Sequence, residues 1–185
     1  MNIIVRPHDG RNCYCRPDTT WERENKDFYV PDLVDELHWA PIVFVRISKA
    51  GKCIGEKFVG RYYDSFNFGM LIYTGAGDIA FSSCTDHTSL LPSPLYDMVV
   101  MESTDNTLEI IKDGSVLFKT ACSDKMRAEI EKAVMDASRL ISLRIGDFVA
   151  LELAHPAKLT DKDQAVTGIK GIFCESTIFE KRIIF

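Results

Sequence analysis

The chain has 185 residues, of which 46% are hydrophobic, so it can bury the core of one domain without disulfides or a structural metal. Its 27 acidic and 22 basic residues give a net charge of −5, with no long run of either sign. This charge balance excludes the basic surface that nucleic-acid binding requires. We therefore expect a single domain, residues 1–185, that does not bind nucleic acid.

The composition of the amino-terminal segment predicts a cytoplasmic protein. Its apolar run covers only residues 3–5 before Arg6 and Pro7, which is much shorter than the apolar core of a secretory signal. No apolar stretch reaches the roughly 18–20 residues of a membrane-spanning helix, since even residues 40–45 end at Arg46. We expect no membrane span.

The six cysteines are scattered along the sequence. Only Cys13 and Cys15 are close together, and a Cys-x-Cys pair without a second cysteine or histidine pair lacks the four ligands of a structural zinc site. The pattern favours reduced thiols over a metal or redox site.

The sequence predicts a strand-rich fold. Strands are expected where β-branched and aromatic residues gather: at residues 3–5, 41–47, 66–73, 79–84, 108–111, 116–119, 148–153, 171–173 and 179–185. Polar, Gly and Pro residues predict loops or turns at residues 11–26, 49–52 and 75–78. A short helix with Pro31 in its first turn is expected at residues 30–37.

Two local patterns are the strongest. Asp113-Gly114 lies between two alternating strands, which is typical of a tight hairpin. Residues 123–141 predict the one main helix, with Ser123 as N-cap and apolar residues repeating every three or four positions. The apolar end of the last strand, residues 183–185, is expected to pair within a sheet.

The passage from this helix into the next strand, residues 136–153 (DASRLISLRIGDFVALEL), carries a family resemblance. It is similar to the helix-to-strand passage ending in Pro-Gly-Asp-Val of the fumarylacetoacetate hydrolase family. Further segments resemble that family in order along the chain: residues 40–46, 66–73, 79–88, 91–96 and 108–119. The resemblance implies an α+β, mostly β fold, a mixed β-sheet roll with one main helix. It also implies metal-dependent chemistry on oxo-acids, as hydrolase, isomerase or decarboxylase.

The resemblance implies that the family's cation site is altered here. Members hold a divalent cation with an aspartate and two glutamates at alternate positions of one strand. Asp86 matches the aspartate, but the glutamates fall on Asn67 and Gly69, which supply no carboxylate. Arg46 stands where the family has lysine, and Arg16 where it has a histidine. With these ligands replaced, the sequence predicts no cofactor. If the protein is active, the resemblance implies Mg²⁺ or Mn²⁺.

Several residues are candidates for the site, each with a structural alternative. Asp86 and His87 are candidates for acid–base catalysis and Asp86 for metal binding, or they lie in a solvated turn. Arg46 is a candidate for binding a substrate carboxylate, with Asn67 and Thr85 beside it, or forms a structural ion pair.

Further candidates lie near the two ends of the chain. Glu152 is a candidate to replace a lost metal ligand, and the structural alternative is that its side chain faces water. The polar group of His8, Asp9, Cys13 and Cys15 belongs to the site or to a surface turn. His155 lines the pocket or lies in a loop.

Three functions remain open from the sequence. The preferred hypothesis is a homodimer that keeps the family fold without its metal centre and binds a small carboxylate or oxo-acid. The first alternative is a divalent-metal-dependent hydrolase, decarboxylase or isomerase of a small oxo-acid, in which Glu152 or Asp64 supplements Asp86. The second is a structural or interaction protein that uses the aromatic residues 61–68 (RYYDSFNF) as a contact surface.

Overall fold

The computed structural model describes residues 1–24, 26–75 and 79–185, and its strands form two β-sheets. The nine-stranded sheet contains β1 (Ile3–Arg6), β2 (Tyr14–Arg16), β3 (Trp21–Glu22), β5 (Glu36–Ile47), β6 (Tyr63–Thr74), β7 (Ser89–Leu90), β8 (Tyr96–Asp97), β11 (Phe148–Glu152) and β12 (Ala157–Asp161). The five-stranded sheet contains β4 (Phe28–Tyr29), β9 (Thr107–Lys112), β10 (Ser115–Ala121), β13 (Val166–Phe173) and β14 (Ser176–Ile184). The helices are α1 (Ile79–Ser82), α2 (Asp124–Leu140) and the 3-10 turns η1 (Asp18–Thr20), η2 (Glu56–Arg61) and η3 (Met98–Glu102).

The larger sheet curls into a roll. Its strand order is β2-β1-β11-β5-β6-β7-β3, so β2 and β3 are its two ends, yet only residues 17–20 separate them in the sequence. Four residues span at most about 14 Å, which forces the two ends of the sheet together. Arg16 on β2 accordingly donates a hydrogen bond to the backbone oxygen of Ile72 on β6 at 2.9 Å. The Thr20 hydroxyl, in the link between β2 and β3, lies 2.8 Å from that of Ser89 on β7.

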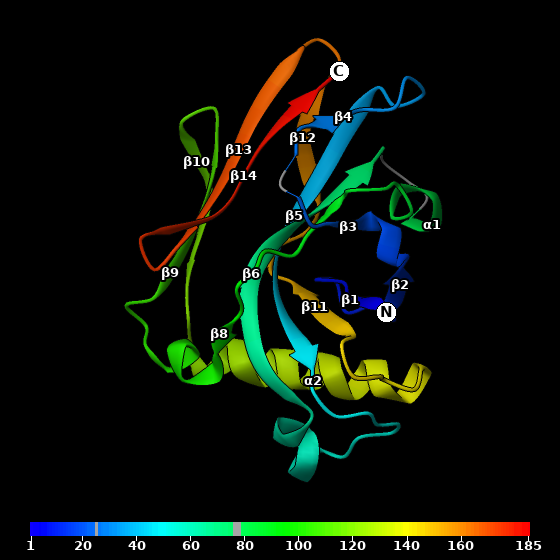
Figure 1. Cartoon of the computed structure of the whole chain (residues 1–185), viewed down its shortest axis with the longest axis vertical. Coiled ribbons are helices and arrows are strands. Elements are labelled where there is room, and N and C mark those ends of the chain that lie inside the picture. Colours follow the sequence, from blue (N-terminus) through cyan, green and yellow to red (C-terminus); the bar gives the residue numbers. More distant parts are fainter. Residues whose placement is uncertain (25, 76–78) are drawn as a thin grey trace.

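The pairing of β5 with β6 divides the core into two parts. The two strands run side by side through the centre of the molecule (Figure 1), in register from Leu37 opposite Thr74 to Arg46 opposite Ser65. Because side chains alternate between the faces, one set points into the roll and the other points outward. The interior set packs with residues of β1 and β11 in one cluster, Ile3, Val5, Ala40, Ile42, Phe44, Leu71, Tyr73, Leu91, Phe148 and Ala150.

The outer face of the roll carries the larger core. Val43, Val45, Phe66 and Phe68 pack there in one cluster with residues of α2 and of the five-stranded sheet. In Figure 1, α2 lies across the lower end of β6, and the five-stranded sheet lies along one side. The apolar side of α2, Met126, Ile130, Ala133, Val134 and Ala137, is buried against this core, as its spacing predicted.

The passage from α2 into β11 is held by Asp147. Its side chain accepts hydrogen bonds from the backbone N–H of Asn2 at 2.7 Å and of Arg144 at 2.8 Å. Gly146 has a φ of +90°, a conformation that favours glycine over residues with a side chain. Gly146 and Asp147, which were part of the sequence resemblance, therefore form the turn that precedes β11.

Most strands lie where the sequence predicted them, and two elements were wrong. The Asp113-Gly114 hairpin is confirmed, with φ of 47° and 82°, and the last strand pairs with β4 through Ile183 and Phe28. The predicted helix at residues 30–37 is instead a turn closed by the Val34 N–H bond to the Pro31 oxygen, followed by β5 from Glu36. Proline favours a turn here, and the residues after the turn pair as part of the long strand β5. The short helical pattern in the sequence therefore does not form a helix.

The second wrong element is the strand predicted at residues 79–84, which is the short helix α1. Local hydrogen bonds, such as the Cys84 N–H to the Phe81 oxygen at 3.2 Å, turn this segment back on itself. The turn predicted at residues 75–78 falls largely on residues 76–78, outside the described part of the chain, and Gly75 has a φ of +96°. The predicted loop at residues 11–26 contains β2, η1 and β3, and β12 was not predicted.

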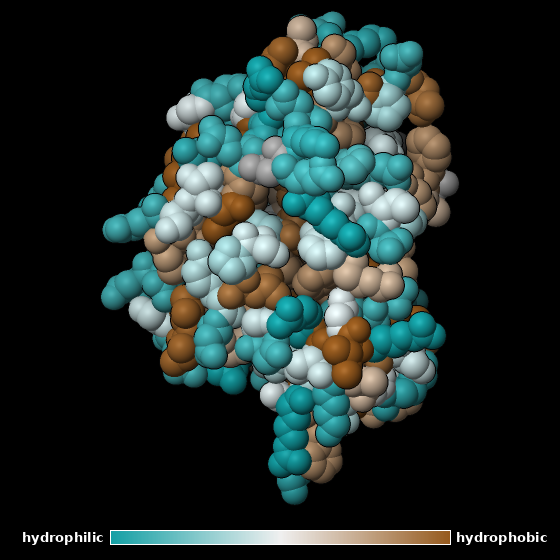
Figure 2. All heavy atoms as spheres, in the orientation of Figure 1, coloured by the Kyte–Doolittle hydropathy of each residue, from teal (hydrophilic) through white to brown (hydrophobic). Residues whose placement is uncertain are grey.

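Three of the four aromatic residues in the segment proposed as a contact surface belong to the core. Tyr63, Phe66 and Phe68 are buried in the outer cluster, whereas Tyr62 is partly buried. Figure 2 shows hydrophobic residues in small separate groups among hydrophilic ones on the visible face. Within the described ranges, no helix is long and apolar enough to cross a membrane.

The start of α2 yields a test of the fold. The Ser123 hydroxyl accepts a hydrogen bond from the Met126 backbone N–H at 3.2 Å, the geometry of an N-cap. We expect Ser123→Ala to lower the free energy of unfolding by about 1 kcal/mol in urea denaturation, because this N–H loses its partner. Ser115→Ala at an exposed strand position is the control and changes stability by less than about 0.5 kcal/mol. Equal losses in the two variants would contradict the capping role.

Candidate functional site

The sequence candidates Asp86 and His87 lie in an exposed turn after α1. His87 has a φ of 61°, and its Nδ1 lies 3.2 Å from Glu22 Oε2. The Thr85 hydroxyl lies 3.0 Å from that of Thr74 at the end of β6. These three residues therefore sit at one rim of the roll.

Arg46 lies at the opposite end of β6. It is opposite Ser65, and its half-exposed guanidinium is 3.7 Å from Asp64 Oδ1, the geometry of a surface ion pair. The turn that holds Asp86 meets β6 instead at Ile72, whose N–H bonds the Thr88 oxygen. Residues 65 and 72 are roughly 23 Å apart along a strand. The structure therefore does not bring Arg46 and Asp86 together in one pocket.

Asn67 and Gly69 point into the roll, where the resemblance placed the family's glutamates. The Asn67 amide donates to the Pro94 oxygen at 3.0 Å and the Pro92 oxygen at 3.4 Å. A Cβ atom on Gly69 would lie 2.2 Å from the backbone oxygen of Leu90. The Asn67 amide nitrogen is therefore hydrogen-bonded to backbone carbonyls, and Gly69 has no room for a side chain.

The interior beside these two positions is filled with aromatic rings. Phe44 stacks edge-on against Phe148 with ring centroids 5.5 Å apart, and Trp21 packs on Phe148 at 5.1 Å. In the described part of the chain, no three His, Cys, Asp or Glu residues gather closely enough to hold a metal ion. The donors at Asn67 and Gly69 do not fit the hard oxygen ligand set of a divalent cation.

A buried polar cluster occupies the other end of the interior, around Glu152. This carboxylate is 3% exposed, and its Oε2 accepts a hydrogen bond from the His8 backbone N–H at 3.0 Å. The Tyr73 hydroxyl donates to Oε1, and the Tyr14 hydroxyl lies 2.8 Å from that of Tyr73. The expectation that Glu152 faces water is wrong, because it lies on the interior face of β11 with Phe148 and Ala150.

Arg16 completes this cluster as a buried cation. It is 1% exposed, and its guanidinium carbon lies 5.1 Å from the centroid of the Tyr73 ring. One terminal nitrogen donates to the Ile72 oxygen and to the Thr88 hydroxyl, at 2.9 and 2.6 Å. Its Nε and the other terminal nitrogen are buried without an acceptor among the described residues, which leaves three N–H donors unpaired.

Burial sets the proton chemistry of this cluster. It raises the pKa of Glu152 above its ordinary value, although hydrogen bonds from Tyr73 and from the His8 backbone oppose the shift. Burial also raises the pKa of Tyr14 to about 12 and that of Tyr73 well above 10. Glu152 is therefore the group of this cluster that loses its proton first as pH rises.

The hydroxyl chain has two orientations. When Glu152 is ionised, Tyr73 donates to it and Tyr14 donates to Tyr73. When Glu152 is protonated, it donates to Tyr73, Tyr73 donates to Tyr14, and the Tyr14 proton is free to bond a ligand oxygen. The arrangement can therefore link the charge of a ligand to the protonation of Glu152.

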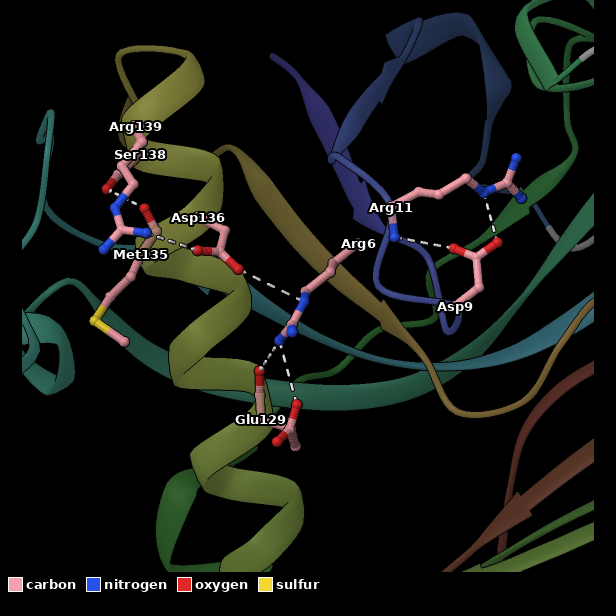
Figure 3. Close-up of polar contacts among 8 residues, drawn as sticks. All are labelled: Arg6, Asp9, Arg11, Glu129, Met135, Asp136, Ser138 and Arg139. Carbon is pink, nitrogen blue, oxygen red and sulfur yellow. Dashed lines mark hydrogen bonds and ion pairs between the residues drawn. The ribbon is translucent and has the colours of Figure 1, made fainter.

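The amino-terminal loop forms the rim of this cluster. The Arg11 backbone and guanidinium both donate to Asp9, and Figure 3 shows these contacts. The rings of His8 and His155 are in edge contact at 4.6 Å. Beside the loop, a cavity of about 460 Å³ is lined by Pro7, Gly10, Arg11, Asn12 and Tyr14.

The two cysteines of the amino-terminal group differ in burial. Cys13 packs against the outer core and Cys15 is exposed. Burial raises the pKa of Cys13 to about 11, so its thiol is protonated at neutral pH. Of the residues predicted in this group, His8 reaches the buried cluster through its backbone N–H.

Solved structures share this fold across nearly the whole chain. One of them is a protein described as belonging to the fumarylacetoacetate hydrolase family, and the likeness confirms the resemblance at the level of the fold. A family protein from Yersinia pestis CO92 has a TM-score of 0.79 at 15% identity and covers 99% of this chain and 92% of its own. No protein-family model matches the chain, and no curated protein does.

Two of the similar structures contain ligands. Maleylpyruvate hydrolase from Sphingobium sp. SYK-6, in complex with manganese(II) and pyruvate, has a TM-score of 0.79 at 12% identity and covers 99% of this chain and 70% of its own. Fumarylpyruvate hydrolase from Pseudomonas aeruginosa, in complex with Mn²⁺ and pyruvate, has a TM-score of 0.73 at 14% identity over 94% of this chain and 78% of its own. At such identities the likeness establishes the fold alone.

The first test at the site concerns Gly69. We expect Gly69→Ala to lower the free energy of unfolding by about 3 kcal/mol, because the new Cβ meets the Leu90 backbone, which two paired strands hold in place. Gly55→Ala is the control, since nothing lies within 4 Å of its new Cβ, and it changes stability by less than about 1 kcal/mol. Chemical denaturation measures both. A stable Gly69→Ala protein would show that this position has room for a side chain.

The second test concerns the pH dependence of stability. Because burial raises the pKa of Glu152 above 4.5, the folded state favours the protonated acid, and the stability this contributes is lost as pH rises through the raised pKa. We expect wild type to lose stability relative to Glu152→Gln as pH rises from 4.5 through the raised pKa of Glu152, because glutamine does not titrate. The exposed control Glu56→Gln shows no such trend. A pH-independent difference between wild type and Glu152→Gln would contradict the assignment.

Proposed function

We propose that the chain binds a small carboxylate or oxo-acid through protein groups alone, without the divalent cation of the family. The observation that carries the proposal is the buried cluster of Arg16, Tyr14, Tyr73 and Glu152 at one end of the roll interior. It joins a buried positive charge to hydroxyl donors, which is the chemistry that recognises a carboxylate.

Two observations support the metal-free part of the proposal. The Asn67 amide nitrogen donates to two proline carbonyls and its oxygen accepts from the Phe68 backbone N–H, and the Leu90 oxygen covers Gly69, so neither position offers a carboxylate. The two structural neighbours described above hold pyruvate together with manganese. We infer that this chain takes a ligand of the same kind with Arg16 in place of the metal as the positive charge.

The metal-dependent alternative has no assembled ligand set. Asp64 pairs with Arg46 at one end of β6, whereas the turn of Asp86 meets the other end. Glu152 is enclosed by Tyr73 and the His8 backbone. These three carboxylates therefore do not converge on one position.

Calorimetric titration of chelator-treated protein tests the proposal. We expect pyruvate to bind saturably, near one per chain, and Mn²⁺ or Mg²⁺ to add neither a tight site nor pyruvate affinity. The matched variant is Asp86→Asn, which leaves pyruvate binding unchanged because Asp86 lies in the exposed turn. Pyruvate binding that requires Mn²⁺, or that is lost in Asp86→Asn, would support the metal-dependent alternative instead.

A further inference from the structure

One end of the molecule carries positive charges that the chain does not neutralise. This basic end consists of two loops, residues 48–62 and residues 140–146, which contain five exposed basic side chains and one acidic one, Glu56. The basic residues are Lys49, Lys52, Lys57, Arg61 and Arg144. Among the described residues, none of these five has an ion-pair partner. Most other basic side chains do have one, so positive charge concentrates here in a chain whose net charge is −5.

The two loops of the basic end are joined by hydrogen bonds. Gly51 and Leu143 exchange two backbone hydrogen bonds, at 3.1 and 2.8 Å. The Lys52 ammonium donates to the backbone oxygen of Leu140, at the end of α2, at 2.9 Å. In Figure 1 the loop of residues 48–62 extends below α2 at the lower end of the molecule. The charges therefore belong to one projecting surface whose two loops hold each other in place.

Exposed apolar side chains lie among these charges. Phe58 is 45% exposed, Leu140 is 53% exposed and Ile145 is 73% exposed. The guanidinium carbon of Arg61 lies 5.4 Å from the centroid of the Phe58 ring, and the Lys57 ammonium lies 5.9 Å from it. Hydrophilic and hydrophobic atoms also lie side by side at the lower end of Figure 2. The basic end thus presents positive charge and apolar area together.

We propose that the basic end docks on an anionic phospholipid surface. The lipid headgroups supply the negative charge that the five cations lack within the chain. The apolar side chains enter the boundary between headgroups and acyl chains, where they leave water. The same surface repels the acidic remainder of the chain, which turns the basic end toward the lipid.

Other occupants fit this surface less well. A symmetric second copy would bring the unpaired cations of both chains together, and like charges in contact oppose association. Duplex nucleic acid would use the cations through its phosphates but would leave the apolar side chains Phe58, Leu140 and Ile145 in water. A lipid surface satisfies both the charges and the apolar groups.

Vesicle sedimentation with the full chain tests the proposal. The probes are vesicles of phosphatidylcholine alone and vesicles of about three parts phosphatidylcholine to one part phosphatidylserine. At about 0.1 M salt we expect at least about tenfold tighter partitioning onto the phosphatidylserine vesicles. Most of this gain is lost at about 1 M salt, where the screening length falls to about 3 Å. Equal partitioning onto the two kinds of vesicle would overturn the proposal.

Three variants, whose folding is checked by circular dichroism, locate the docking surface. The double variant Lys57→Gln and Arg61→Gln weakens partitioning by at least about tenfold, because each basic residue near an anionic surface contributes about fivefold. Phe58→Ser keeps the charge and weakens partitioning several-fold, because an apolar side chain no longer enters the lipid. The matched control, Lys125→Gln with Lys162→Gln, removes two exposed charges outside the basic end and leaves partitioning unchanged.

The remaining outcomes would each contradict the lipid assignment. Equal weakening by the control pair would place the docking surface elsewhere. Unchanged partitioning of Phe58→Ser, or binding of a duplex DNA oligonucleotide as tight as that of phosphatidylserine vesicles, would indicate a general polyanion site instead. A wild-type dimer in light scattering that dissociates in the Lys57→Gln and Arg61→Gln variant would assign the basic end to self-association. None of these measurements depends on pyruvate binding, so the proposed function is tested separately.

Discussion

The closure of the large sheet is the constraint on which the rest of the structure depends. Strands β2 and β3 lie at opposite ends of the sheet, and the four residues between them allow no separation beyond about 14 Å. Closure places the side chains of Tyr14 and Arg16 inside the roll, where they meet β6. Without it, both would project from an edge strand into solvent, and no polar cluster would form.

The register of β5 against β6 decides what the closed roll contains. A slip of one residue would exchange the two faces and turn Phe66 and Phe68 inward in place of Asn67 and Gly69. With the observed register, aromatic rings fill the part of the interior beside Asn67 and Gly69. Polar groups remain at the end of β6 that carries Tyr73. The same geometry therefore explains both the filled interior at the expected metal positions and the polar cluster that accompanies it.

The sequence predicted the elements that local interactions determine. The Asp113-Gly114 turn, the Ser123 cap and the Gly146-Asp147 turn each depend on residues close in sequence, and each lies where expected. The elements at residues 30–37 and 79–84 were wrong because short apolar segments do not distinguish helix from strand without their neighbours.

The polar cluster was not predictable in the same way. Tyr14, Arg16, Tyr73 and Glu152 come from three strands that only the closed roll brings together. Residues 11–26 have the composition of a loop, so strand β2 was not predicted there. Alternation in β11 did mark Glu152 as pointing away from Leu151, but both faces of this strand are buried, so that direction led into the interior and not to water.

A comparison with Lys181, another buried cation, shows how Arg16 differs from a charge held in an ion pair. Lys181, on β14, is 2% exposed and lies 2.7 Å from Glu22 Oε2 on β3, so it links the two sheets through a direct ion pair. Arg16 is buried as deeply, yet it has no ion pair among the described residues, and it contacts the Tyr73 ring at 5.1 Å while the Tyr73 hydroxyl bonds Glu152. A cation that only stabilises the fold gains most from direct contact with its acid, as Lys181 does. Arg16 therefore keeps unpaired donors in the interior, whereas the charge of Lys181 is satisfied within the chain.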